Sequence, residues 1–158
     1  MSIDDFKGLM DAFDPASLLP ELGPIFDKFA VAARIVVLIG PAALIVMGLI
    51  FLFASPKEAN YYIGYRCYYG MGSVEAWRFT QRLAGIVWCA LGLVLLVAMM
   101  LISGSFAGMQ TMDLLWKTLY CVAGEAVAVA VTCIGINTTV TIRFDSKGNE
   151  RRKKKARR

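Results

Sequence analysis

Charged and aromatic side chains gather in one internal segment, residues 60–82 (NYYIGYRCYYGMGSVEAWRFTQR), which lies between two long apolar runs. Arg78 and Arg82 are four residues apart, so on a helix they share a face and can both reach phosphate groups. Arg66 keeps its charge at physiological pH, and Glu75 is its nearest candidate partner, with lipid phosphate as the alternative. The chemistry that this segment offers is charge recognition at a membrane surface.

Residue types that serve covalent or metal catalysis are absent or isolated. The chain has no histidine, the commonest general base and metal ligand. Its cysteines form no CxxC pair and three lie in apolar runs, so we expect buried thiols rather than a disulfide or zinc site; they are Cys67, Cys89, Cys121 and Cys133. We therefore expect no enzyme activity, cofactor or metal, and no direct contact with nucleic acid.

One acidic residue, Glu125, lies within the third apolar run. An ionisable side chain near the centre of a membrane-spanning helix costs about 2.5–3.5 kcal/mol on insertion scales. We expect Glu125 in the outer half of its helix, where the cost is smaller. Two interpretations stay open: a contact with a ligand, proton or ion inside a helix bundle, or a carboxyl group that bonds a neighbouring helix or reaches the outer surface.

Three apolar runs must position these residues: 35–53, 84–102 and roughly 119–142. Of the 158 residues, 58% are hydrophobic, whereas soluble domains have about 45–50%. A helix needs about 20 mainly apolar residues to cross a bilayer, and single strands would leave their backbone groups unpaired in lipid. The sequence therefore predicts an all-α integral membrane protein with three transmembrane helices.

The basic residues predict the orientation of these helices. Three lysines and arginines precede the first run, four lie in the first loop, one in the second loop and nine after residue 142. Basic flanks stay in the cytoplasm, and three helices place the first loop and the tail on one side. We predict that the amino terminus is outside and the carboxyl terminus inside.

The chain divides into three parts: an interfacial segment (1–34), a membrane domain (35–142) with a cytoplasmic loop (55–83), and a basic tail (143–158). The first part has apolar residues at helical spacing between aspartates. We predict an amphipathic helix on the outer leaflet, with a tethered, poorly ordered tail as the alternative. The basic tail would bind anionic lipid or an acidic cytoplasmic partner through Arg151, Arg152, Lys153, Lys154, Lys155, Arg157 and Arg158.

Local signals add detail to the helices. The Gly40-Pro41 pair predicts a kink in the first span, because proline removes a backbone hydrogen bond. Ser73 is a predicted N-cap, and Glu75 in the following turn suits the helix dipole. Trp77 would then lie about one turn into the helix, at headgroup depth.

A more specific pattern comprises Pro56-Lys57, Asn60-Tyr61, Ile63-Gly64-Tyr65-Arg66, Met71 and Glu75-x-Trp77. It resembles the SdpI family of small bacterial membrane proteins, whose loop has the form N-x-x-x-G-Y-R-T, followed by a Ser/Asn-rich turn and a tryptophan. The resemblance covers about residues 45–100. The positions that match in register are Asn60, Gly64, Tyr65, Arg66, Glu75 and Trp77. Cys67 replaces the usual threonine, and Thr80-Gln81 replaces Ala-Asn or Ala-Gln.

The resemblance implies a short, multi-pass member of this family in the bacterial cytoplasmic (inner) membrane. It implies immunity to, or signalling of, a secreted toxin or peptide without catalysis. The implied partners are that peptide and a cytoplasmic regulator, together with anionic lipid, and a homo-oligomer remains open. The alternative function is a small oligomeric transporter or ion-coupled, channel-like protein that uses Glu125.

A physical role for the matched residues follows as a hypothesis. We expect an ion pair between Arg66 and Glu75 to close the loop. Gly64 would permit its turn, and Trp77 would pack against it at the interface.

Overall fold

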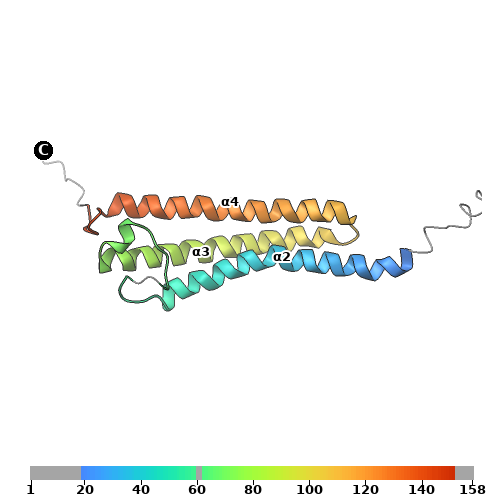
Figure 1. The fold of residues 1–158 in the computed structure, drawn as a ribbon, viewed down its shortest axis with the longest axis horizontal. Coiled ribbons are helices and arrows are strands. Elements are labelled where there is room, and N and C mark those ends of the chain that lie inside the picture. Colours follow the sequence, from blue (N-terminus) through green and yellow to red (C-terminus); the bar gives the residue numbers. More distant parts are fainter. Residues whose placement is uncertain (1–18, 60–61, 152–158) are drawn as a thin grey trace, which may run out of the picture.

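A computed structural model describes residues 19–59 and 62–151 of the chain (Figure 1). These residues form three long helices, α2 (Leu19–Phe53), α3 (Val74–Ser103) and α4 (Thr111–Arg143), and two short 3-10 helices, η2 (Tyr69–Met71) and η3 (Gly104–Phe106). No strand occurs in the described ranges, although one isolated antiparallel bridge joins Phe144 to Glu150. The prediction of an all-α fold is confirmed.

Three segments are long and apolar enough to cross a membrane: Lys28–Phe53 in α2, Val74–Phe106 across α3 and η3, and Met112–Arg143 in α4. Large apolar side chains also face outward along these segments; Leu101 and Ile134, for example, are 76% and 66% exposed. In water such a surface would promote association, whereas lipid covers it at no cost. The protein is therefore a multi-pass membrane protein with three spans, as predicted.

Two helices begin before the apolar runs that predicted them. Helix α2 runs without a break from Leu19 to Phe53, so the helix is continuous across residue 34. Helix α4 begins at Thr111, about eight residues before the predicted run. Residues 1–18, where we predicted the amphipathic pattern, lie outside the described residues. Helix α3 begins directly after Ser73, as its capping signal predicted.

The three helices lie side by side, and the chain reverses direction at both connections (Figure 1). The loop between α2 and α3 lies at the same end of the bundle as the end of α4, and the turn between α3 and α4 lies at the other end. Below, the loop end means residues 54–59, 62–73 and 144–151. Helix α2 bends midway along its length (Figure 1), as expected from the missing backbone donor of Pro41.

Helices α2 and α3 approach each other closely at Gly48. A methyl group there would lie 2.8 Å from the backbone nitrogen of Cys89 and 2.9 Å from the carbonyl oxygen of Gly85. Small residues allow such close contact of two helix backbones, which in lipid supplies much of the packing energy. The α2–α3 pair is therefore the tightly packed part of the bundle.

Buried apolar side chains form two clusters. One lies at the loop end and comprises Phe51, Ala76, Ala84, Ile136, Val140 and Phe144. The other comprises Val37, Met99, Phe106 and Leu114. The clusters hold α4 against the other two helices at both ends of the bundle.

Candidate functional site

The loop between α2 and α3 folds back onto the first turns of α3. Gln81 lies one turn after Trp77, and both side chains are buried. The Gln81 amide pairs with the backbone of Tyr65: Nε2 donates to the carbonyl oxygen and Oε1 accepts from the N–H, both at 2.8 Å. The indole Nε1 of Trp77 donates to the carbonyl oxygen of Pro56 at 2.9 Å. Two side chains of α3 thus satisfy backbone groups on both sides of the loop.

Gly64 gives the loop its turn. Its φ of +122° is a conformation that residues with a side chain rarely adopt. A methyl group at this position would also lie 2.7 Å from the ring of Trp77 and 3.0 Å from Oε1 of Gln81. The predicted roles of Gly64 and Trp77 in the loop agree with this geometry.

Tyr65 connects the loop to α4. Its hydroxyl lies 3.1 Å from Oδ1 of Asn137 and 3.2 Å from the carbonyl oxygen of Cys133, both of which accept. Its ring meets that of Trp88 edge to face, with 5.8 Å between centroids. Burial raises the pKa of the Tyr65 hydroxyl far above its ordinary value, and the bond at Cys133 acts in the same direction. The hydroxyl therefore stays a neutral donor at physiological pH.

Cys67 and Thr80 pack around Gly70, the middle residue of η2. A methyl group on Gly70 would lie 2.5 Å from Oγ1 of Thr80 and 2.7 Å from Sγ of Cys67. Thr80 is fully buried and donates to the carbonyl oxygen of Ala76 at 2.8 Å. Burial raises the pKa of the Cys67 thiol, so this thiol is a packing group and not a reactive thiolate.

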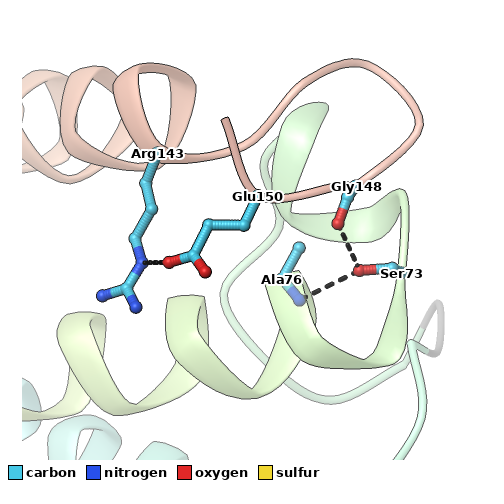
Figure 2. A network of polar contacts seen from close by, with 5 residues as sticks. All are labelled: Ser73, Ala76, Arg143, Gly148 and Glu150. Carbon is cyan, nitrogen blue, oxygen red and sulfur yellow. Dashed lines mark hydrogen bonds and ion pairs between the residues drawn. The ribbon is translucent and has the colours of Figure 1, made fainter. Parts of the chain in front are cut away.

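Ser73 joins the start of α3 to the segment after α4 (Figure 2). Its Oγ accepts from the backbone N–H of Ala76 at 3.1 Å, which confirms the predicted N-cap, and donates to the carbonyl oxygen of Gly148 at 2.8 Å. A methyl group on Gly148 would overlap the backbone of Ser73 and Gly72. Residues 75 positions apart in the chain are thereby held together.

Residues 144–151 form a tight hairpin that was predicted only as a basic tail. Its turn is held by Asp145, whose Oδ1 accepts from the backbone N–H groups of Asn149 at 2.8 Å and Lys147 at 2.9 Å. These bonds hold the pKa of Asp145 below its ordinary range, and the bond from the Asn149 backbone has the largest effect. The backbone N–H of Arg151 donates to the carbonyl oxygen of Arg143 at 2.8 Å, so the hairpin turns back along the end of α4.

Arginines of α3 and α4 line a cavity of about 580 Å³ at the loop end. Arg143 forms an ion pair with Glu150 at 2.8 Å (Figure 2) and stacks over the ring of Phe79 at 4.4 Å. Arg78 and Arg82 also line the cavity, and no ion pair engages them within residues 19–59 and 62–151. The two side chains thus lie on one face of α3, as their four-residue spacing predicted, and both border the cavity.

The predicted site residues are only partly brought together. Gly64, Tyr65 and Trp77 meet in the loop, whereas Asn60 lies outside the described residues. The expected ion pair between Arg66 and Glu75 is wrong, because the only ion pair within the described part of the chain is that of Arg143. Arg66 is exposed, and Glu75 lines the arginine cavity. Gln81 closes the loop instead. Of the predicted tail residues, Arg151 donates to the carbonyl oxygen of Phe144 at 3.1 Å; the others lie outside the described ranges.

Glu125 lies inside the bundle, far from the loop end. Its side chain is 7% exposed and faces Gly40 of α2, where a methyl group would overlap its Oε2. Its other oxygen, Oε1, is buried without a hydrogen-bond partner among the described residues. The carboxyl group borders a groove of about 440 Å³ between α2 and α4, lined otherwise by apolar residues such as Met47 and Val129.

Sequence reasoning missed three residues that build the loop end: Gln81, Asn137 and Gly148. Gln81 is four residues after Trp77, so helical spacing alone places both on one face. Asn137 is a polar side chain in the third apolar run, which marks it as a candidate for an internal hydrogen bond. Gly148 belongs to the turn sequence DSKGN, whose aspartate and glycine favour a tight turn.

Replacing Gln81 by leucine tests the loop closure. The substitution leaves the N–H and carbonyl groups of Tyr65 without partners, so we expect the free energy of unfolding in detergent to fall by about 2–4 kcal/mol. Hydrogen exchange at the Tyr65 amide should also accelerate. The matched control is Gln110→Leu, since Gln110 is exposed and its side chain caps no helix; equal losses in the two variants would contradict the assignment.

One of the comparisons with known proteins identifies a family. The model of a family described as the SdpI/YfhL protein family matches residues 57–140, a little more than half of the chain. No curated protein and no solved structure matches the chain. The matched range contains most of the loop, all of α3 and most of α4, and excludes α2 and the hairpin.

Proposed function

Because this chain belongs to the SdpI/YfhL protein family, we propose that it is an immunity or signalling protein of a bacterial cytoplasmic membrane. It acts without catalysis and responds to a secreted toxin or peptide. The observation that carries the proposal is the family match itself, which spans most of the loop, α3 and most of α4. The alternative, an oligomeric transporter or ion-coupled channel that uses Glu125, stays a prediction.

The loop end faces the cytoplasm in this proposal. The bias of basic residues toward the first loop and the tail supports that orientation. Arg78 and Arg82, at the cavity of α3 and α4, would then lie beside anionic headgroups, as would the basic tail. A cytoplasmic regulator would meet the same surface.

A signal can pass from the membrane to the loop through Tyr65. Its hydroxyl bonds α4 within the third span, and its backbone is paired with Gln81 of α3. A peptide that shifts α4 relative to α3 would therefore strain the bonds at Tyr65. The loop would change conformation, and with it the exposed Arg66 that a regulator can contact.

Protection assays test the proposal. The gene is deleted in its own host, and survival is measured in fractions of that strain's secreted peptides. We expect the deletion to sensitise the cells and the full chain to restore survival. The variant Arg66→Gln should restore it about ten- to a hundredfold less well, because a charge-assisted contact contributes about 1.5–3 kcal/mol.

The control for this experiment is Lys147→Gln, which removes another exposed cation at the loop end and should protect like the wild type. Membrane levels of both variants are compared by immunoblot. A deletion strain that is no more sensitive than its parent to any secreted fraction would refute the immunity role.

A further inference from the structure

The groove between α2 and α4 combines an apolar lining with one polar group. Its lining residues include Leu44 and Met47 of α2 and Val122 and Val129 of α4, and its volume is about 440 Å³. Small-molecule sites typically measure about 300–1,000 Å³ and are mainly apolar, with a few polar groups that orient the ligand. Here the polar group is the carboxyl of Glu125.

One oxygen of that carboxyl group is buried without a hydrogen-bond donor among the described residues. Oε1 of Glu125 is buried and, within the described part of the chain, accepts no hydrogen bond. A buried acceptor without a donor is unfavourable, and more so when it is charged. The side chain is held at this position because Gly40 leaves room for Oε2, and its Cδ would lie 3.4 Å from a methyl group there.

The depth of Glu125 restricts what can supply the missing donor. Lys117, eight residues earlier on α4, bonds to Ser105 beside the α3–α4 turn at 2.7 Å. The apolar span of α4 runs from Met112 to Arg143. Glu125 lies 13 residues after its start, about 20 Å along the helix, and so in the interior of that span. A donor that reaches this depth from the bilayer must be carried by an apolar molecule.

We infer that the groove binds a small lipophilic molecule with a hydrogen-bond-donating group, an amine or a hydroxyl, which donates to the carboxyl group of Glu125 as that group turns toward the groove. The apolar part of the ligand occupies the groove, and the molecule enters sideways from the lipid. The low dielectric constant of the surroundings strengthens the bond between donor and carboxyl group. This site stands whether or not the immunity role holds, because it rests on Glu125 and the groove alone.

Photolabelling of the full chain in phosphatidylcholine vesicles tests the site. The probe is a long-chain primary amine with a diazirine in its chain; the matched probes are the corresponding alcohol and methyl ether. We expect the amine and the alcohol to label the α2 and α4 segments of the groove. The ether cannot donate, so its labelling should be about tenfold weaker, equivalent to about 1.4 kcal/mol.

Three variants assign the labelling to the carboxyl group. Glu125→Leu removes the acceptor, and Gly40→Ala displaces it; both should reduce labelling by the amine about tenfold. Gly124→Ala is the control, since a methyl group there meets nothing within 4 Å, and it should label like the wild type. Circular dichroism checks folding, and Gly40→Ala replaces Glu125→Leu if the latter does not fold.

The inference is overturned if the ether labels the groove as strongly as the amine, or if Glu125→Leu and Gly40→Ala leave labelling unchanged. Absence of label from the groove with every probe also overturns it. A crosslink from the groove to a second copy of the chain would show that another protomer occupies this surface and would likewise rule out the small-molecule site.

Discussion

Replacing Gly64 by alanine is expected to lower the free energy of unfolding by about 2–6 kcal/mol. Backbone strain contributes about 1–3 kcal/mol of this, because the φ of +122° suits only glycine. Overpacking contributes a similar amount, since the added methyl group would lie 2.7 Å from the Trp77 ring. Denaturant titration in detergent measures the loss, and tryptophan fluorescence should shift to longer wavelength as the Trp77 ring is exposed.

The control for Gly64 is Gly104→Ala, at the end of α3. Gly104 has a φ of −58° and open space where an added methyl group would lie. The free energy of unfolding of this variant should therefore differ from that of the wild type by less than about 0.5 kcal/mol. Equal stability of the two variants would mean that the loop does not pack on Trp77.

The second large effect is expected from Gly48→Ala, which should destabilise the α2–α3 pair by about 3 kcal/mol or more. The groups that the methyl would meet include the backbone nitrogen of Cys89 and the carbonyl oxygen of Gly85. Backbone atoms cannot rotate away, so the helices must separate. Unfolding in mixed detergent measures the loss, and a membrane-permeant maleimide should react faster with Cys89.

Gly135→Ala on α4 is the matched control, because nothing lies within 4 Å of its added methyl group. Both substitutions favour the helix by about 1 kcal/mol, because alanine has a higher helix propensity than glycine. The difference between the unfolding free energies of the two variants therefore isolates the packing of α2 on α3. If Gly48→Ala is as stable as Gly135→Ala, the two helices do not pack as closely as described.

The sequence was sufficient to predict the three spans, because uninterrupted apolar runs admit few structures in lipid. The start of α3 was also predictable, since the Ser73 cap depends on residues three positions apart. The start of α2 was not: the amphipathic pattern of residues 1–34 suggested a separate segment, and Gly23-Pro24 is a helix-breaking pair, yet α2 is continuous through both residues. Signals within one segment, such as an apolar run or a capping residue, were therefore enough to predict features of that same segment.

The candidate site was harder to predict because its bonds join distant residues. Charge alone suggested the pair Arg66–Glu75, but a neutral amide, Gln81, can both donate to and accept from the backbone of Tyr65 and so replaces two separate partners. The bond between Tyr65 and Asn137 depends on how α4 packs on α3. Neither arrangement follows from the spacing of residues within one segment.

The bond between Ser73 and Gly148 has a consequence for how the protein is made. Its two partners are separated by 75 residues, so at 5–20 residues per second about 4–15 s of translation pass between their synthesis. During this time α3 is complete but the hairpin that covers its first turn does not yet exist. The nascent chain must therefore carry an unfinished loop end through the insertion of α4, and synthesis of the hairpin sets the earliest moment at which the loop end can close.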